Sequence, residues 1–421
     1  MTAAPTHLAP ADSQATPPWD ALGAAPNSPL RAYIARRLFR HAVRHLPVRI
    51  TLPGGVTLGA GGPDAPLMDI LRPSAFFHRL GADAKIGFGE SYMAGDWNSP
   101  RLADLLTPFA ERMATLVPTP LQAFRRWVDA PKPGTAQNTA PNARQNISRH
   151  YDLSNDVFGT FLDETMTYSS ALFRDSAEDL RTAQERKIDQ ILDLAGVRTG
   201  TRVLEIGTGW GGLALRAADR GAQVTSLTLS SEQQQLARER IAAAGHGDRV
   251  DVRLEDYRDA EGQYDAVVSV EMIEAVGSEY WPTYFATLDR LTAPGGRVGL
   301  QAITMPHDRM LATRRSHTWI HEYIFPGGEL PSVESVEHAA RDHTTLEITD
   351  RHAFGLSYAD TLERWRETFV HRWDDVAALE FSERFRRMWE FYLAYSEAGF
   401  RSRYLDVWQF GFRKNREHAA H

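Results

Sequence analysis

Apolar and polar positions follow two different patterns after residue 143 of this chain. Short apolar runs predict strands at 202–206, 223–229, 250–254, 264–270 and 296–303. Between them, apolar residues recur every three or four positions and predict helices at 183–195, 233–244 and 280–291. Strands that alternate with helices are typical of a doubly wound, mainly parallel sheet. We therefore expect an α/β fold here, followed by a mostly helical stretch at 358–385 and a last strand at 405–412.

A smaller α+β unit is predicted before residue 129. Strand-like alternation at 48–58 and 65–71 surrounds a Pro-Gly-Gly turn, and a helix follows near 101–116. Ahead of these strands, residues 28–46 have the pattern of an amphipathic helix with arginines on its polar faces. Such a helix either lies on an anionic membrane surface or exposes a solvated face while it packs on its own domain.

Composition divides the chain into domains. At 421 residues the chain is long for a single core, which favours two domains. Residues 1–27 are rich in Ala, Pro and Thr and predict a flexible tail, whereas residues 129–142 have the composition of a linker. The predicted organisation is therefore a tail, a small domain at 28–128, the linker, and a larger domain at 143–421.

Charge and missing residue types argue against several classes of function. A net charge of -7 gives no general basic surface, so we expect no nucleic-acid partner. The cysteine count of 0 excludes disulfides, thiolate metal sites and cysteine nucleophiles, and it fits a reducing compartment. We find no signal-peptide pattern and no apolar run of about 18 residues, so we expect a protein that meets lipid only from the surface. Neither metal-site spacing nor a Gly-x-Ser-x-Gly hydrolase turn occurs.

The segment VLEIGTGWGGL at 203–213 joins a predicted strand to a predicted helix through a glycine-rich turn. Gly207, Gly209 and Gly211 let the backbone turn sharply and approach a ligand closely. Such a turn at the carboxyl end of a parallel strand is typical of nucleotide-type cofactor sites. The charge of Glu205 disfavours a pyrophosphate and favours S-adenosylmethionine, which carries an ammonium and a sulfonium group. The alternative is a tight strand-to-helix connection without a ligand.

Two further strand ends carry side chains suited to the same cofactor. Thr228, Leu229 and Gln233 lie where many nucleotide folds bind the ribose hydroxyls, and an amide can donate and accept such bonds. Beyond the next strand, Asp256 offers a carboxylate to an adenine amino group, and Tyr257 offers a ring to stack on the base. Tyr257 is alternatively a plain core aromatic.

Six separated motifs together resemble one family. They are RHYDLSNDVFGTFLDETMTYSSALF at 149–173, VLEIGTGWGG, LTLSSEQ, DYRD, SVEMIEAVG and YIFPGGELPS at 323–332, in this order. By these motifs the chain is identified as a member of the cyclopropane-fatty-acid synthase family, which includes the mycolic-acid methyltransferases. The resemblance implies a class I S-adenosylmethionine-dependent methyltransferase, a Rossmann-like doubly wound sheet, with a smaller α+β N-terminal domain like that of the phospholipid-acting members.

The resemblance also implies partners and cofactor contacts. We expect a membrane phospholipid with an unsaturated acyl chain as substrate, a homodimer, a partner reductase, and a cytoplasmic location peripheral on the inner membrane surface. The positions that match the family's cofactor contacts are Tyr168, Ser169, Gly207, Gly209, Thr228, Leu229, Gln233 and Tyr257.

In the family's reaction, a cis double bond attacks the cofactor's methyl group and leaves a carbocation that must lose a proton. In cyclopropane-forming relatives a bicarbonate ion takes this proton, held by a cysteine, a glutamate, a histidine, an isoleucine backbone and a tyrosine. These places fall here on Ser170, Glu274, Gln301, Ile303 and Tyr358. Serine still donates a hydrogen bond, but glutamine lacks the charge that a protonated histidine offers to an anion.

Glu271 stands where relatives often have glycine. If Glu271 points inward, its charge opposes bicarbonate and can replace it; the alternative is a solvated residue at a helix start. The inward arrangement favours loss of a different proton after a hydride shift, which leaves a 10-methylene chain, the precursor of 10-methyl branched acids. In the other outcome, Ser170 and Gln301 are tolerated exchanges and a cyclopropane forms.

Two further hypotheses keep part of this picture. The chain is alternatively a small-molecule methyltransferase, or a non-catalytic lipid-binding protein that retains affinity for the cofactor. Phe173, Trp319 and Phe325 are expected to wall an acyl channel, and His150 is expected to be structural rather than a base.

Overall fold

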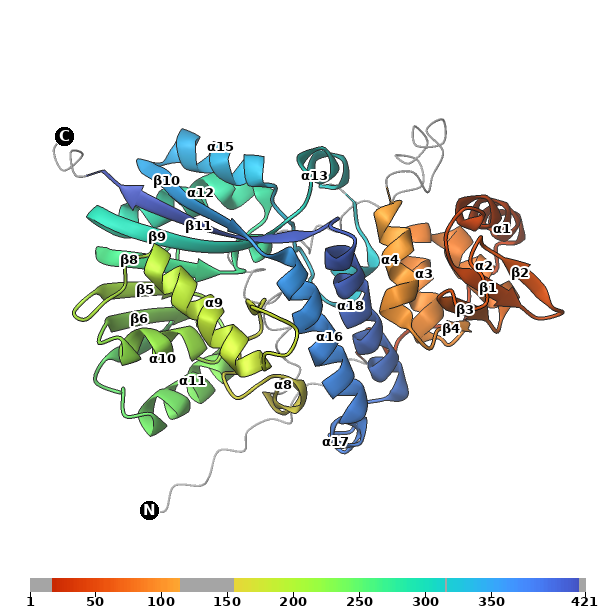
Figure 1. Ribbon diagram of the computed structural model, residues 1–421, viewed down its shortest axis with the longest axis horizontal. Coiled ribbons are helices and arrows are strands. Elements are labelled where there is room, and N and C mark those ends of the chain that lie inside the picture. The colour runs from red at the N-terminus through yellow and green to blue at the C-terminus, as the bar shows by residue number, and fades with distance from the viewer. Residues whose placement is uncertain (1–16, 114–154, 315, 416–421) are drawn as a thin grey trace, which may run out of the picture.

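The computed structural model describes residues 17–113, 155–314 and 316–415, and these form two sheets joined by long helices (Figure 1). The larger sheet has seven strands in the order β10-β11-β9-β8-β5-β6-β7, and the smaller has four in the order β2-β1-β3-β4. The linker expected at 129–142 and His150 lie outside the described residues.

Five parallel strands make up most of the larger sheet: β5 (Arg202–Ile206), β6 (Gln223–Thr228), β7 (Val250–Leu254), β8 (Tyr264–Val270) and β9 (Thr292–Thr304). The chain then adds β11 (Asp406–Lys414) antiparallel to β9, and β10 (Leu346–Ala353) antiparallel to β11. The strand order changes direction between β5 and β8. In open α/β sheets, ligands bind beside such a switch point, at the carboxyl ends of the strands.

Helices cover both faces of this sheet, which is why its central strands are apolar on both sides. One face packs on α9 (Leu180–Leu194), α10 (Gly212–Asp219) and α11 (Ser231–Ala243). The other packs on α12 (Trp281–Leu291) and α15 (Val333–His343). Neighbouring residues of β5 show the division, because Val203 joins the first core and Leu204 joins the second. The doubly wound sheet predicted from the sequence is confirmed.

The N-terminal unit is built on the smaller sheet, with β1 (Arg49–Leu52), β2 (Val56–Leu58), β3 (Leu67–Ile70) and β4 (Trp97–Asn98). Its helices are α1 (Pro29–Val43), α2 (Pro73–Ala82), α3 (Ala84–Met93) and α4 (Leu102–Glu111). The helix predicted at 28–46 is thus present as α1, and the helix predicted at 101–116 ends earlier, at Glu111.

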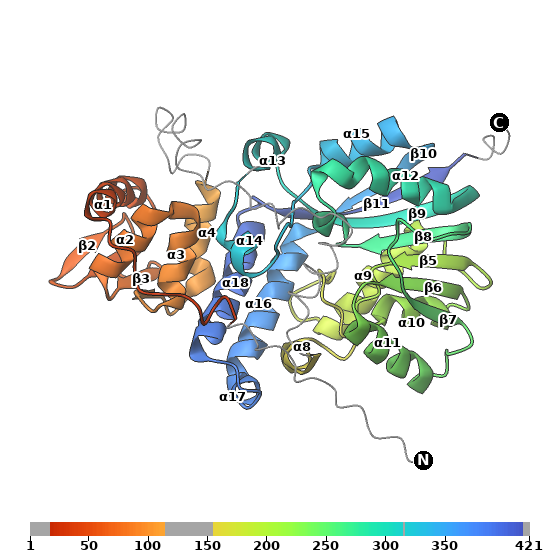
Figure 2. The same cartoon turned by 180° about the vertical axis from the view of Figure 1, so that it is seen from behind.

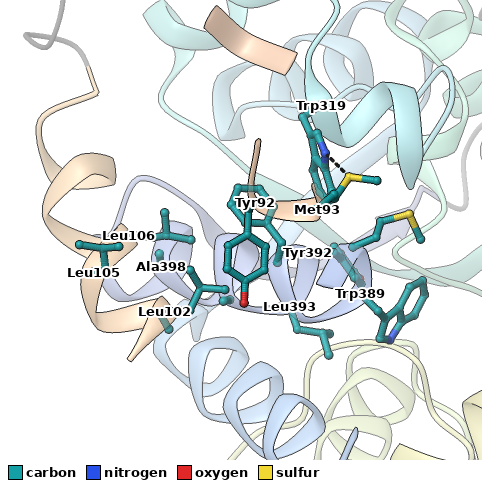
Figure 3. Packing of buried hydrophobic residues seen from close by; sticks show 14 of the residues in the cluster. Tyr92, Met93, Leu102, Leu105, Leu106, Trp319, Trp389, Tyr392, Leu393 and Ala398 are labelled. Carbon is teal, nitrogen blue, oxygen red and sulfur yellow. Dashed lines mark hydrogen bonds between the residues drawn. The ribbon is translucent and has the colours of Figure 1, made fainter. Parts of the chain in front are cut away.

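Three C-terminal helices lie between the two sheets: α16 (Gly355–His371), α17 (Trp373–Ala377) and α18 (Glu383–Arg401) (Figure 1). α18 packs on α16 on one side and on α3 and α4 on the other, so one hydrophobic cluster runs through both units. Figure 3 shows this packing, with Tyr92 and Leu102 of the N-terminal unit against Leu393 and Ala398 of α18. Helix α14 (Trp319–Tyr323) contacts α3, and both are labelled in the view of Figure 2.

Residues 17–27 differ from the flexible tail expected there. Trp19 packs on Phe385 with ring centroids 5.3 Å apart, and the Ser382 hydroxyl donates to Asp20 at 2.7 Å. Arg79 also donates to the carbonyl of Gly23 at 2.7 Å. The Ala- and Pro-rich composition concealed these contacts, because a single tryptophan and backbone carbonyls anchor the segment.

Candidate active site

The glycine-rich turn joins β5 to α10 at the switch point of the sheet. Gly207, Gly209 and Gly211 have φ values of 98, 52 and 86°, a left-handed backbone that favours glycine. A Cβ on Gly207 would lie 2.6 Å from Cγ of Met272, so this position also lacks space for a side chain. At Gly209 nothing lies within 4 Å of an added Cβ, so the backbone there is open to a close ligand. The glycine-rich turn predicted between this strand and helix is therefore present, and its contact with the cofactor stays a prediction.

Glu205 is buried in the sheet, with 3% of its surface exposed. Its Oε2 accepts a hydrogen bond of 2.5 Å from the Ser226 hydroxyl of the neighbouring strand. Burial raises the pKa of Glu205 to about 8, and the bonds from Ser226 and the field of Lys187 only partly oppose this. The carboxyl of Glu205 therefore favours its protonated form near neutral pH in the absence of a ligand.

The remaining cofactor candidates lie at the carboxyl ends of β6 and β7. The Thr228 hydroxyl donates to Oε1 of Gln233 at 3.0 Å, and Leu229 between them is half-buried. Asp256 forms an ion pair of 2.6 Å with Arg258. Its carboxylate therefore already has a partner, whereas the sequence offered it to the adenine amino group. Tyr257 packs edge-on against Tyr284 at 5.5 Å in the core below α12, which places the ring in the core position that was its alternative.

Tyr168 and Ser169 precede α9, and Ser169 lies beside a buried lysine that sequence reasoning missed. Lys187 of α9 is 1% exposed, and its Nζ donates to the Ser169 hydroxyl at 2.6 Å. Burial lowers the pKa of Lys187 to about 8, although the nearby Glu271 opposes the shift. A signal was present in the sequence, since Lys187 and Gln184 fall on the apolar stripe of α9 together with Ile188 and Ile191.

Three donors converge on the carboxylate of Glu271, directly after β8. Its Oε1 accepts from the Ser170 backbone amide at 3.0 Å and from Nε2 of Gln301 at 2.8 Å. Its Oε2 accepts from the Tyr358 hydroxyl at 2.7 Å. The side chain therefore points inward, and the alternative of a solvated helix-start residue is wrong. The three donors come from positions that the resemblance assigned to holding bicarbonate.

The backbone at Glu271 is left-handed, with φ of 52°. This conformation costs a non-glycine residue about 1–3 kcal/mol, so such residues persist only where their surroundings fix them. Burial raises the pKa of Glu271, while the bonds from Ser170, Tyr358 and Gln301 and the field of Lys187 lower it. The net shift of the pKa is upward, so it is the three hydrogen-bond donors and the nearby Lys187 that favour the ionised form of Glu271.

Glu274 lies one turn further on, in the short helix η2 (Ile273–Ala275). Its Oε1 accepts from the Ile303 backbone amide at 2.5 Å, so this amide bonds to Glu274, whereas the resemblance gave it to bicarbonate. Its Oε2 is buried and has no hydrogen-bond partner among the described residues. Burial, reinforced by the charge of Glu271, raises the pKa of Glu274 to about 8. Of the two carboxyls, Glu274 therefore favours its protonated form near neutral pH, and the three donors favour Glu271 as the carboxylate.

Gln301 is the uncharged donor that the sequence suggested, whereas Ser170 donates to the site through a different group. Ser170 donates to the site through its backbone amide, because its hydroxyl donates to the carbonyl of Ala171 at 2.9 Å. The amide of Gln301 is held by Gln409 of β11, whose Nε2 donates to Oε1 of Gln301 at 2.9 Å. This bond turns Nε2 of Gln301 toward Glu271 and makes Gln301 a fixed, neutral donor.

Tyr358, which donates to Glu271, belongs to a cluster of aromatic rings. Tyr358 stacks on Phe400 at 4.5 Å, and Tyr168 stacks on Trp365 at 5.3 Å. Trp365 also meets Tyr358 edge-on at 6.3 Å, so the rings form one connected cluster. Faces of aromatic rings attract cations, which suits a site where positive charge develops.

The three expected channel residues are not equivalent. Phe325 packs edge-on against Tyr392 at 5.7 Å, and Tyr392 in turn lies 2.7 Å from Tyr168 through their hydroxyls. Phe173 is half-buried under the guanidinium of Arg364. Trp319 is the first residue of α14 and packs on α3, where its indole nitrogen donates to the sulfur of Met93 (Figure 3). Trp319 therefore holds the two units together.

No group of three or more His, Cys, Asp and Glu side chains in the described part of the chain is placed to hold a metal ion. No helix there is long and apolar enough to cross a membrane.

The strand order, the glycine-rich turn and the carboxyl cluster define a class I S-adenosylmethionine-dependent methyltransferase. Residues 138–410 match the family described as mycolic acid cyclopropane synthetase, and the chain belongs to this family. It is 54% identical over 401 residues to the tuberculostearic acid methyltransferase UfaA1 of Mycobacterium tuberculosis, covering 93% of this chain and 94% of the relative. It is 37% identical over 346 residues to the cyclopropane-fatty-acyl-phospholipid synthase of Escherichia coli (strain K12), covering 81% and 86%.

A solved structure agrees with this assignment. The mycolic acid cyclopropane synthase CmaA1 complexed with SAH and CTAB has a TM-score of 0.60 and 31% identity. The match covers 67% of this chain and 99% of CmaA1. The expected enzyme class, fold and cofactor are therefore confirmed.

Proposed function

We propose that this enzyme methylates the cis double bond of unsaturated acyl chains in phospholipids and releases a 10-methylene fatty acyl product. The observation that carries the proposal is the Glu271 carboxylate, held by Ser170, Gln301 and Tyr358. The donors that the resemblance assigned to a diffusible bicarbonate ion instead bond to the side chain of Glu271. The base therefore belongs to the protein.

The proposed chemistry balances without an external oxidant or reductant. S-adenosylmethionine supplies the methyl group. The alkene's π electrons form the new C–C bond as the C–S bond breaks, and the neighbouring carbon becomes a cation. A hydride then moves from the methylated carbon to that cation, and the methylated carbon becomes positive. Loss of a proton from the new methyl group leaves an exocyclic methylene.

In this scheme Glu271 accepts the proton on its carboxylate. Tyr358, Gln301 and the Ser170 amide hold that carboxylate in one orientation, and each bond lowers its basicity. A base held in one orientation leaves the cation time for the hydride shift, whereas prompt removal of the proton closes a cyclopropane. The rings of Tyr358 and Trp365 stabilise the cation meanwhile.

Glu274 has a different role in this proposal. With a pKa of about 8 it is mostly neutral at pH 7, and its unpartnered Oε2 is free to donate or accept within the site. A neutral Glu274 avoids a second buried negative charge beside Glu271. Such a charge would raise the pKa of Glu271 and favour its protonation.

The names of the relatives support both halves of the proposal. UfaA1 is named for tuberculostearic acid, and the Escherichia coli enzyme is named for fatty acyl phospholipid. A methylene product needs two electrons and two protons to become a methyl branch, and we propose that a partner reductase supplies them. The homodimer stays a prediction.

The test is to express the chain in a host supplied with oleate and to identify new fatty acids by mass spectrometry. We expect a methylene-branched C19 acid, absent from cells with empty vector and from cells with Glu271→Gln. A cyclopropane acid in the wild type would overturn the methylene product. Unchanged lipids, with methyl transfer to soluble amines or phenols instead, would favour a small-molecule methyltransferase. Unchanged lipids without any transfer would favour a lipid-binding protein.

A further inference from the structure

Helix α1 has two apolar faces, of which the fold uses only one. Its inner face carries Ala32, Ala35, Phe39 and Val43, which pack on the N-terminal unit. Its outer face carries exposed apolar side chains: Leu30 at 72%, Tyr33 at 57%, Ile34 at 47% and Leu38 at 43% exposure. Leu30, Ile34 and Leu38 are four residues apart and so form one stripe along the outside of the helix.

Unpaired positive charge flanks this stripe. Residues 21–63 contain no Asp or Glu, in a chain whose net charge is -7. The arginines of the helix and its C-cap are Arg31, Arg36, Arg37, Arg40 and Arg44, all exposed. Within the described residues no carboxylate lies in ion-pair distance of any of them. Arginines elsewhere are commonly paired, as Arg216 and Arg220 are with Asp189.

We propose that the outer face of α1 docks on the surface of an anionic phospholipid membrane. An apolar stripe bordered by arginines and an aromatic residue has the composition of a helix that lies in the lipid interface. Leu30, Ile34 and Leu38 enter the acyl boundary, while Arg37, Arg40 and Arg44 meet the phosphates. The choice of lipid as partner rests on the proposed function, whose substrate is carried in a membrane.

The alternative occupant is a second copy of this chain. Two copies that met through this face would bring two sets of unpaired arginines together, with no acidic residue of the segment to offset them. Charge repulsion therefore disfavours that contact, whereas an anionic bilayer complements the face. Figures 1 and 2 show α1 on the outside of the N-terminal unit, away from the seven-stranded sheet and from α18. No described element covers its outer face, since Leu30, Ile34 and Leu38 are exposed.

The experiment is flotation of the purified full-length protein with vesicles of phosphatidylcholine, with or without phosphatidylglycerol. We expect binding that requires phosphatidylglycerol and weakens as salt is raised. The variant Arg37→Gln/Arg40→Gln/Arg44→Gln is expected to bind roughly 100-fold more weakly, at about fivefold per arginine. Leu30→Ser/Ile34→Ser/Leu38→Ser is expected to lose binding to a similar degree. The matched controls, Arg341→Gln and Leu254→Ser, change exposed residues elsewhere and are expected to bind like the wild type.

Three results would overturn the docking proposal: equal binding to both vesicle types, wild-type binding by the α1 variants, or a change of their oligomeric state in sedimentation. Methyl transfer to phospholipid dispersed in detergent separates this proposal from the proposed function. The α1 variants are expected to keep that activity, because none of the changed residues lies in the active site. A wild type that binds vesicles but never methylates dispersed phospholipid would contradict the proposed function and would still support docking through α1.

Discussion

Glu271 combines a left-handed backbone with a carboxylate fixed by donors from three distant parts of the chain. The donors are 101, 30 and 87 residues away in sequence. The sequence could identify Glu271 as unusual, but it could not give the direction of the side chain. That direction depends on contacts with Ser170, Gln301 and Tyr358, which only the folded chain brings together.

Glu271→Gly removes the proposed base and relieves the strained backbone. We expect this variant to lose the methylene product and to regain turnover only when bicarbonate is added, now with a cyclopropane product. The measurement is fatty acid analysis after reaction with oleoyl phospholipid, with and without bicarbonate. The wild type is expected to ignore bicarbonate.

Glu271→Gln is the control for that experiment, because it removes the charge but keeps the side chain in the site. It is expected to be inactive with or without bicarbonate. Methylene formation by Glu271→Gly at the wild-type rate would exclude Glu271 as the base.

Glu274→Gln probes a carboxyl whose folded-state pKa is raised to about 8. The stability that comes with the neutral form is fully present below pH 4.5, the ordinary value, and is lost as the pH rises through about 8. Glutamine stays neutral at every pH, so its melting temperature relative to the wild type should rise between pH 6 and pH 9. A difference that is constant over this range would show that Glu274 is not protonated in the folded protein.

Lys187→Met removes the buried ammonium while nearly keeping its volume. Lys187 lowers the pKa of Glu271, so its loss should shift the rising limb of the pH–rate profile upward by about one unit, the low end for loss of a nearby opposite charge. The control Lys85→Met changes a lysine of the N-terminal unit that donates to Ser316. This variant should leave the pH–rate profile unshifted. An unshifted limb in Lys187→Met would refute electrostatic coupling to Glu271.

At the scale of elements, the central strands could be predicted because each is an apolar run between amphipathic helices. Several elements of the C-terminal part were missed: α13 (His307–Thr313), α14, α15, β10 and most of α18. The edge strand β10 reads LEITDRHA and is polar along most of its length, since only one edge of it is paired. Helix α18 is apolar on two sides, because it lies between α16 and the N-terminal unit, and this blurs the one-sided pattern of a surface helix.

The contact between α3 and α14 gives a prediction at this scale. A Cβ on Gly89 would lie 2.5 Å from the indole of Trp319, so Gly89→Ala should destabilise the protein by about 1–3 kcal/mol through overpacking. Gly159→Ala in α8 (Asn155–Phe161) meets nothing within 4 Å and should stabilise by up to about 1 kcal/mol. Urea unfolding of the two variants checks this, and equal midpoints would contradict the packing at Gly89.

At the scale of the whole molecule, composition suggested separate domains, whereas the core is continuous. One hydrophobic cluster includes Phe76 and Trp97 of the N-terminal unit together with Trp365 and Phe391 of the C-terminal helices. A sequence pattern reports burial of each segment but not which segment covers it, so this shared core could not be predicted.

A shared core predicts a single unfolding transition. Calorimetry should show one peak, and S-adenosylmethionine at about 100 times its Kd should move the whole peak upward, with about 2.7 kcal/mol of added stability. Two peaks, of which only one responds to the cofactor, would contradict cooperative unfolding of the two units.

Two adjacent residues of α18 face different neighbours. Phe391 packs on Trp319 and Tyr92, while Tyr392 reaches the hydroxyl of Tyr168 beside the glycine-rich turn. A single turn of α18 thus contacts both the N-terminal unit and the active site. Because the two contacts share one helical turn, we expect a displacement of the N-terminal unit against α18 to change the position of the Tyr168 hydroxyl.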